Sequence, residues 1–190
     1  IDNTPNPRSN PRDLIRAGVG YVPEDRRLQG LFFDLAVSEN IVVPYMRSLA
    51  GPLGVRALPA ERRLVETRLA DFRVKTASTA SLPGELSGGN QQKLLISRWM
   101  HEDSRVLLLD EPTRGIDIGA KAEIYRLIHE AAARGVAILL VSSEMPELLA
   151  LSDRVLVMGE GHVRGVLTGA DMTQTNILTL ATRENAPASL

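Results

Sequence analysis

The sequence predicts an α/β fold with a mainly parallel sheet. Two continuous apolar runs, Val106–Leu109 and Val136–Val141, have the length and composition of strands that are buried on both faces of such a sheet. Between them, apolar residues recur at helical spacing, and Gly135 then provides a natural helix C-terminus. The residues of this stripe are Ile124, Leu127, Ile128 and Ala131. Strands that alternate with helices indicate a parallel sheet covered by helices.

The segments on either side extend this pattern. Val19–Val22 predicts a short strand that ends at Pro23, and residues of about 35–100 predict mostly helix, including a helix that follows Ser87-Gly88-Gly89. Near the C-terminal end, a Gly-Glu-Gly turn between two apolar runs predicts a hairpin over Val155–Leu167. We therefore expect one domain over 1–190, with a helical subdomain at about 35–100 and a core at about 101–190.

The composition excludes several classes of protein. Hydrophobic residues make up 44% of the 190 residues and charged residues 24%, which is typical of a globular domain. The absence of cysteine excludes disulfides, thiolate metal sites and cysteine nucleophiles. A net charge of −1 provides no general attraction to nucleic acid or to an acidic membrane surface. No signal peptide is visible, and the apolar runs are too short to span a bilayer, so a membrane role requires a partner.

The segment Leu86–Gln92, called the signature segment below, predicts an anion site. Gly88 and Gly89 stand just before a helix, where backbone N–H groups have no partner inside the helix. The helix dipole makes this end partly positive, and Ser87 adds a hydroxyl donor. The terminal phosphate of a nucleotide fits such a site, although an ordinary serine-capped helix has the same local sequence.

A second motif is the apolar run that ends in Asp110-Glu111. Carboxylates at the C-terminal end of a parallel strand lie where α/β sheets bind their ligands. Asp110 is suited to hold Mg²⁺, usually through water, and Glu111 to polarise an attacking water molecule. A strand that simply ends in a solvated acidic turn is the simpler alternative.

Together the two motifs resemble those of ATP-binding-cassette (ABC) ATPases, in which they occur in this order with one helix between them. The signature segment is similar to the ABC signature, Val106–Glu111 to the Walker B strand, and Gly115-Ile116-Asp117 to the D-loop. More narrowly, the chain resembles the C-terminal half of the double ATPase subunit of bacterial monosaccharide importers of the ribose, galactose and xylose type. The segments that carry this narrower resemblance are Val22–Arg27, Leu86–Lys93, Asp110–Gly115 and Ser142–Glu144.

The resemblance implies a P-loop-NTPase-like ABC ATPase core with a parallel sheet and a helical subdomain, and the cofactors ATP and Mg²⁺. It implies a catalytic role for Glu111 and a metal-binding role for Asp110. It also implies nucleotide-binding roles for a group of seven residues: Ser87, Gly88, Gly89, Asn90, Glu24, Asp117 and Ser143.

Three of these residues differ from the usual ABC pattern. Glu24 stands where the Q-loop glutamine is expected, Asn90 where the signature ends in glutamine, and Ser143 where the switch histidine is expected. An imidazole titrates near neutral pH and a serine hydroxyl does not. These differences predict weakened ATP hydrolysis at the site of this half.

No phosphate-binding loop of the form G-x-x-x-x-G-K-[ST] occurs in the chain. We therefore expect a domain truncated before the Q-loop strand, with the phosphate-binding loop missing, and an isolated fragment without activity. The resemblance implies several partners: an N-terminal ATPase half, transmembrane permease subunits and, indirectly, a periplasmic sugar-binding protein, but no nucleic acid. It implies a peripheral location at the cytoplasmic face of the bacterial inner membrane.

Two alternatives remain open at the level of sequence. One is an ABC ATPase fragment of the DNA-repair or chromosome-maintenance type, which shares the signature and the Asp-Glu strand. Such proteins need long coiled-coil arms and basic DNA-facing surfaces, whereas this chain has neither sustained heptads between Ala60 and Leu86 nor a basic charge balance. The other is a half that acts only as a scaffold or interaction partner.

Overall fold

The computed structural model describes residues 10–47, 49–50, 54–101 and 103–182. The chain divides into two compact units, Ile1–Val141 and Ser142–Leu190. The expected boundary between a helical subdomain and a core, near residue 100, lies inside the first unit and stays a prediction. The expected domain 1–190 also includes residues outside the described ones.

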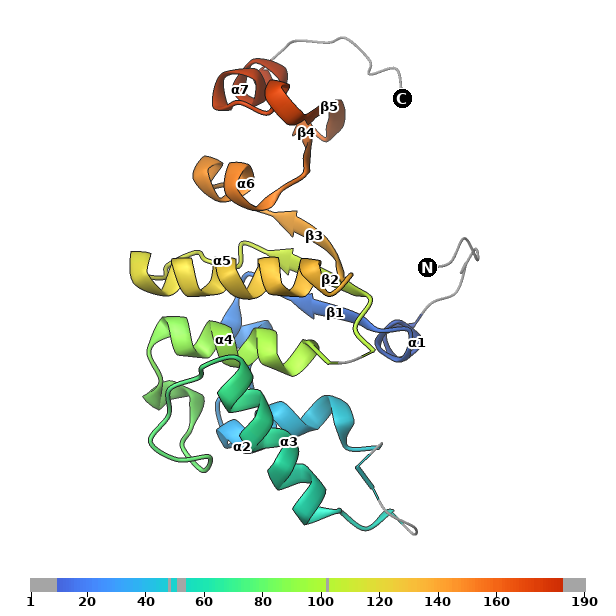
Figure 1. The fold of residues 1–190 in the computed structure, drawn as a ribbon, viewed down its shortest axis with the longest axis vertical. Coiled ribbons are helices and arrows are strands. Elements are labelled where there is room, and N and C mark those ends of the chain that lie inside the picture. The colour runs from blue at the N-terminus through green and yellow to red at the C-terminus, as the bar shows by residue number, and fades with distance from the viewer. Residues whose placement is uncertain (1–9, 48, 51–53, 102, 183–190) are drawn as a thin grey trace. The chain divides into compact units, whose positions relative to one another are not determined.

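The first unit contains a three-stranded parallel sheet in the order β1-β2-β3 (Figure 1). Its strands are β1 (Val19–Val22), β2 (Val106–Asp110) and β3 (Ala137–Val141). Val22 lies beside Leu109, and Asp110 lies beside Val141. The carboxyl ends of the strands therefore meet at one end of the sheet, where α/β sheets bind ligands.

Helices make up much of the rest of this unit. Its α-helices are α1 (Pro11–Arg16), α2 (Val37–Val42), α3 (Leu58–Asp71), α4 (Gly88–Trp99) and α5 (Ile118–Ala133). Its shorter helical turns are η1 (Arg26–Gly30), η2 (Val43–Tyr45) and η4 (Pro83–Glu85). The predicted apolar stripe of α5 is buried in full, and Gly135 follows the helix with a φ of 87°, so this prediction is confirmed.

The two faces of the sheet are buried to different extents. On one face, Leu109 is 1% exposed, and a Cβ added to Gly20 would lie 2.7 Å from Cβ of Trp99, so α4 packs directly on this face. On the other face, Leu139 is 62% and Val141 55% exposed. Successive side chains of a strand point to opposite faces. The prediction of burial on both faces is therefore wrong for β3, while the residues of β2 on this face are partly buried.

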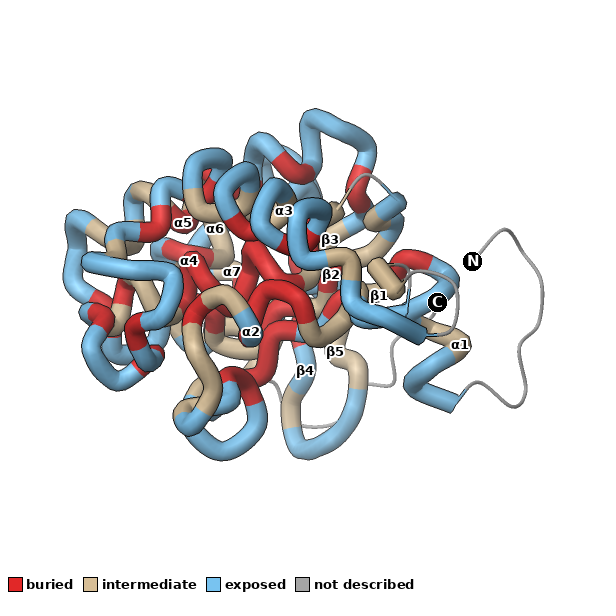
Figure 2. Tube along the Cα trace, turned by 90° about the horizontal axis from the view of Figure 1, so that it is seen from below, coloured by how far each residue is buried: buried red, intermediate tan, exposed pale blue. Residues whose placement is uncertain are grey.

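The helix α4 is buried along most of its length, as Figure 2 shows. Near its C-terminal end, Arg98 is buried and donates through Nη2 to the carbonyl oxygen of Gly30 at 2.6 Å and to Oδ1 of Asn40 at 3.4 Å. Burial lowers the pKa of Arg98 to about 10. The guanidinium group also lies over the ring of Phe32, 5.4 Å from its centroid. Polar side chains thus join α4 to α2 and to the segment after β1.

The second unit combines a hairpin with two α-helices. Its elements are α6 (Met145–Leu151), β4 (Arg154–Gly159), β5 (His162–Thr168), η5 (Gly169–Asp171) and α7 (Gln174–Thr182). β4 and β5 pair antiparallel across a turn in which Glu160 and Gly161 have positive φ, so the predicted hairpin is confirmed. Val155, Val157 and Ile177 form its small core. Across both units, none of the described helices is long and apolar enough to cross a membrane.

Candidate functional site

Ser87 is the N-cap of α4. Its backbone is extended, with φ −62° and ψ 156°, and its Oγ accepts a hydrogen bond from the Asn90 backbone N–H at 3.4 Å. The first turn of α4 contains no acidic side chain, so its partly positive end is not neutralised from within the helix. Ser87 itself is exposed. The predicted helix is present but begins at Gly88, so both glycines belong to its first turn, which offers backbone N–H groups beside the Ser87 hydroxyl group to an anion.

The two signature glycines have different surroundings. A Cβ on Gly89 would lie 2.4 Å from Cβ of Ala120, so the first turn of α4 packs against α5 at a distance that only glycine allows. A Cβ on Gly88 would lie 3.9 Å from both Nη2 of Arg26 and the carbonyl oxygen of Gly115. The signature segment and the start of α5 are therefore brought together, with the Arg26 guanidinium group close by.

Asn90 connects the signature segment to the turn after α3. Its Oδ1 accepts a hydrogen bond from the Lys75 backbone N–H at 2.9 Å. Its Nδ2 donates to Oγ of Ser87, also at 2.9 Å. The Asn90 amide group is therefore held between a backbone donor and the Ser87 hydroxyl group.

Asp110 and Glu111 lie at the carboxyl end of β2. The Tyr21 hydroxyl group donates to Oδ2 of Asp110 at 3.4 Å, and burial together with this carboxylate raises the pKa of Tyr21. Glu111 donates through its backbone N–H to the carbonyl oxygen of Val141 at 2.8 Å. Its φ of 48° is unusual for a residue other than glycine, and such strained backbone is often found at functional sites.

These carboxylates suit one kind of metal site. The described residues contain no group of three or more His, Cys, Asp or Glu side chains that could enclose a metal ion. Mg²⁺ is commonly held by one or two carboxylates together with substrate phosphates and water. A carboxylate at a strand end is compatible with that role, and the predicted metal-binding role of Asp110 stays a prediction.

Asp117 is the N-cap of α5. Its Oδ1 accepts a hydrogen bond from the Ala120 backbone N–H at 2.9 Å. The helix turn that it caps is the one on which Gly89 packs. Asp117 therefore has a structural role in this chain, and its predicted role toward a nucleotide stays a prediction.

Glu24 lies in the loop after β1 and forms an ion pair with Arg114, which lies in the loop after β2. Two residues further on, Arg26 is half-buried, and burial lowers its pKa, while Asp25 acts in the opposite direction. Asp25 caps η1 through hydrogen bonds from the backbone N–H groups of Arg27 and Leu28, at 2.8 and 3.0 Å. The charged segment after β1 thus contains an ordered helical turn.

Ser143 lies in the second unit, where it precedes α6. The neighbouring Ser142 accepts a hydrogen bond through Oγ from the Glu144 backbone N–H at 3.0 Å. The role of Ser143 at a nucleotide site stays a prediction, whereas the other predicted site residues all belong to the first unit.

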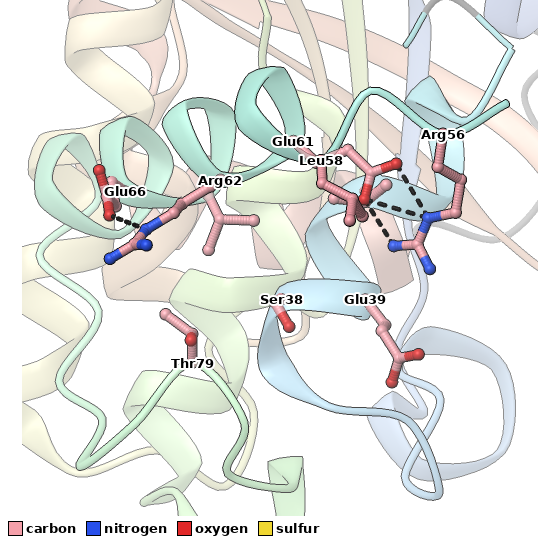
Figure 3. A pocket seen from close by; sticks show the side chains of 10 residues that line it. Ser38, Glu39, Arg56, Leu58, Glu61, Arg62, Glu66 and Thr79 are labelled. Atoms are coloured by element: carbon pink, nitrogen blue, oxygen red, sulfur yellow. Dashed lines mark hydrogen bonds and ion pairs between the residues drawn. The ribbon is translucent and has the colours of Figure 1, made fainter. Parts of the chain in front are cut away.

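A cavity of about 400 Å³ lies between α2 and α3 (Figure 3). The Arg56 side chain lies at its edge and is paired with Glu61, with Nη2 and Oε2 2.5 Å apart. Hydrogen bonds from Arg56 lower the pKa of Glu61. None of the residues that line this cavity is a predicted site residue. The cavity is therefore separate from the nucleotide chemistry predicted from the sequence.

Four residues near the predicted site residues were not predicted from the sequence. Each contacts or lies close to a signature residue, Asp110 or Glu24. They are Tyr21, Arg26, Lys75 and Arg114. Tyr21 is on the exposed face of β1 and Lys75 acts through its backbone, so neither carries a sequence signal. Arg26 and Arg114 lie within the segments that carry the family resemblance, which was the only signal available for them.

The comparisons with known proteins agree with the fold and with these motifs. The family described as ABC transporter matches residues 1–114. A solved structure, described as the dimer of the ATP-binding cassette MJ0796 in a post-hydrolysis state bound to ADP and Pi, superposes with a TM-score of 0.73. That likeness covers 88% of this chain and 71% of the other at 21% identity, and it shows a shared fold.

Curated relatives are considerably closer in sequence. Ribose import ATP-binding protein RbsA of Shigella dysenteriae serotype 1 is 46% identical over 185 residues, which are 97% of this chain and 36% of that protein. RbsA 2 of Escherichia coli O157:H7 is 47% identical over 191 residues, with the same coverage of 97% and 36%. RbsA of Bacillus subtilis is 44% identical, covering 91% of this chain and 35% of the relative. The chain thus spans about a third of the length of these relatives.

These names confirm the predicted resemblance to the ATPase subunits of monosaccharide importers. The fold class is confirmed by the parallel sheet with its helices and by the likeness to a solved ATP-binding cassette. Since the family match extends over more than half of its residues, the chain belongs to the ABC transporter family.

Proposed function

We propose that this chain is the C-terminal nucleotide-binding half of the ATP-hydrolysing subunit of a bacterial monosaccharide importer. The observation that carries the proposal is the close packing of the signature segment on the start of α5, where Gly89 has no room for a Cβ beside Ala120. It sets an anion-binding helix end beside the loop that follows Asp110-Glu111. The high identity to ribose import ATP-binding proteins, over almost the whole chain, supports the sugar class.

Ser87, Gly88 and Gly89 bind the terminal phosphate of a nucleotide that is held by the opposite half of the subunit. The bare N–H groups of α4 and the exposed Ser87 hydroxyl group donate to phosphate oxygens. The nearby Arg26 guanidinium group adds positive charge at this end. Charge-assisted hydrogen bonds of this type strengthen as charge develops on the transferred phosphoryl group.

Asp110 and Glu111 serve the nucleotide bound to this half. Mg²⁺, when bound, neutralises phosphate charge and orients the phosphates. Asp110 would hold it at the end of β2, where the Tyr21 hydroxyl group donates to the same carboxylate at 3.4 Å. Glu111 accepts a proton from the attacking water, and its unusual backbone φ of 48° turns the residue away from the line of the strand.

Glu24, Asp117 and Ser143 complete the nucleotide region of the two halves. Glu24 replaces the Q-loop glutamine and is paired with Arg114. Asp117 lies at the interface between the halves as well as capping α5. Ser143 takes the position of the switch histidine and does not titrate near neutral pH. The site on this half is therefore the weaker of the two.

The remaining part of the longer subunit supplies the phosphate-binding loop, since this chain contains none. The subunit lies at the cytoplasmic face of the inner membrane, bound to two permease chains that carry the sugar. The periplasmic sugar-binding protein acts on the permease and not on this chain directly. Nucleic acid is not a ligand, in keeping with the net charge of −1.

ATP titration by calorimetry tests the proposal. The chain alone is expected to bind ATP–Mg²⁺ with a Kd above about 1 µM. A Kd of that value corresponds to a binding free energy of about 8 kcal/mol in favour of the complex. It is also expected to have no ATPase activity alone and to gain activity when it is joined to the N-terminal half. Equal activity with and without that half would overturn the assignment. DNA binding at low salt would instead favour the DNA-maintenance type of ABC ATPase.

A further inference from the structure

The Asn90 amide group is held in one orientation by its two neighbours. The Lys75 backbone N–H lies 2.9 Å from one end of the amide and can only donate, so that end is the oxygen Oδ1. The other end is then the NH₂ group, and it lies 2.9 Å from Oγ of Ser87. Because the backbone contact determines the orientation of the amide, Asn90 is a donor toward Ser87.

The Lys75 backbone is itself held in place. Val74 donates through its backbone N–H to the carbonyl oxygen of Leu69 at 2.9 Å, which closes the end of α3. The buried Lys93 ammonium group of α4 donates to the carbonyl oxygen of Arg73 at 2.7 Å and to Oε2 of Glu123 at 2.8 Å. The turn that orients Asn90 is therefore tied to both α4 and α5.

This arrangement determines what the Ser87 hydroxyl group can do. A hydroxyl oxygen has two acceptor positions and one hydrogen. Both acceptor positions of Ser87 are used by Asn90, through Nδ2 at 2.9 Å and through the backbone N–H at 3.4 Å. Within the described part of the chain, no acceptor for the Ser87 hydrogen is recorded. The hydrogen is therefore free to point outward at the N-terminal end of α4.

We propose that Asn90 is a positioning residue, which directs the Ser87 hydroxyl hydrogen toward the terminal phosphate of the nucleotide. The inference rests on the proposed function, since that function assigns the phosphate to Ser87. It gives a physical role to the asparagine that replaces the usual signature glutamine. In this role Asn90 acts through Ser87 and does not itself contact the phosphate.

A double-mutant cycle in the full-length subunit, assembled with its permease, tests the inference. Single-turnover ATP hydrolysis is measured for the native subunit, Ser87→Ala, Asn90→Ala and the double variant. Ser87→Ala is expected to lose about tenfold, and Asn90→Ala about three- to tenfold, as the loss of a hydrogen bond to charge predicts. In the Ser87→Ala background, Asn90→Ala is expected to cost less than about twofold, because the group that it positions is gone.

Asn90→Asp provides a variant with the same shape. One carboxylate oxygen still accepts from the Lys75 backbone N–H, so the turn and the thermal midpoint are retained. The other oxygen can only accept, so it draws the Ser87 hydrogen inward and away from the phosphate. With Ser87 present, Asn90→Asp is therefore expected to reduce turnover more than Asn90→Ala does.

Two results would overturn the inference in different ways. If Asn90→Ala lowers turnover by the same factor with and without the Ser87 hydroxyl group, Asn90 does not act through Ser87, although the proposed function stands. If Ser87→Ala leaves turnover unchanged, the phosphate role of the signature segment fails, and both the proposed function of this segment and the inference fall.

Discussion

Glu24 and Arg114 form an ion pair that joins the loop after β1 to the loop after β2. The two residues are far apart in the sequence, and neither is part of a helix or strand. Their side chains are 44% and 66% exposed, so water screens the interaction strongly. The pair therefore holds Glu24 beside the acidic end of β2 without adding much to the stability of the fold.

The first prediction concerns this pair. Glu24→Gln, which restores the usual Q-loop residue, is expected to change the free energy of unfolding by less than about 1 kcal/mol, because exposed pairs contribute little. Urea unfolding of the native chain and the variant measures this. The charge-swapped double variant, Glu24→Arg with Arg114→Glu, serves as the control. A loss above roughly 2 kcal/mol for Glu24→Gln would mean that the pair is part of a larger, desolvated network.

The second prediction separates the two signature glycines. Gly89→Ala is expected to destabilise the chain by about 1–3 kcal/mol, because its Cβ would overlap Ala120. Gly88→Ala is the matched control: the nearest atoms to its Cβ lie 3.9 Å away, so the fold is retained. In the full-length subunit, the added methyl group of Gly88→Ala is nevertheless expected to reduce ATP turnover, because it points toward the phosphate position. Equal thermal midpoints for the two variants would contradict this assignment.

Local sequence signals predicted the helices and strands well, because capping and periodicity act over a few residues. Ser87 caps α4 as expected, and the stripe on α5 is buried as expected. The burial of β3 could not be predicted in the same way. An apolar strand looks the same in sequence whether one face or both faces are covered, and covering depends on residues that are distant in sequence.

The contacts within the candidate site were less accessible to sequence reasoning. The family motifs selected Glu24 and Asn90, but the partners of both residues come from other loops, namely Arg114 and the Lys75 backbone. No periodicity or spacing relates such positions, since the sheet and α4 bring them together. For Asp117, the motif implied a nucleotide-binding role, while the structure adds a helix-capping role that its position before α5 could have indicated.

The third prediction concerns pH. Burial lowers the pKa of His101, with Arg68 acting in the same direction and Asp103 opposing it. Its Nδ1 accepts a hydrogen bond from the Asp103 backbone N–H at 3.1 Å, which requires the unprotonated nitrogen. Below a pH of about 6.5 the unfolded chain takes up a proton at this position before the folded chain does, so stability falls as the pH decreases.

Thermal midpoints between pH 7 and pH 5 measure this effect. His101→Phe keeps an aromatic ring beside Tyr45, whose ring centroid lies 5.7 Å from that of His101, but it cannot be protonated. The variant is expected to lose less stability than the native chain over this range. A parallel decrease in both proteins would assign the pH dependence to other groups. The control is His162→Phe, which removes a histidine from β5 instead.

The last prediction concerns which of the two nucleotide sites hydrolyses ATP. In the proposed function, the signature segment of this half completes the nucleotide site on the opposite half, while Glu111 serves the site on its own half. The sequence has Glu24 and Ser143 at the positions of the usual Q-loop glutamine and switch histidine, so we propose that the site on this half is the weaker one. Ser87→Arg in the full-length subunit is expected to lower turnover on the order of a hundredfold, because it removes a phosphate donor and adds bulk.

Glu111→Gln is expected to cost less than about tenfold, because in the proposed function the site that it serves contributes little turnover. Glutamine has the same shape as glutamate and takes the same backbone, so the positive φ of 48° affects both proteins alike and the fold is retained. Single-turnover rates of the two variants, each assembled with permease, measure the difference. Equal losses, or a larger loss for Glu111→Gln, would mean that both sites hydrolyse ATP. In that case Glu24 and Ser143 do not weaken the site on this half, and the two halves contribute equally to ATP hydrolysis.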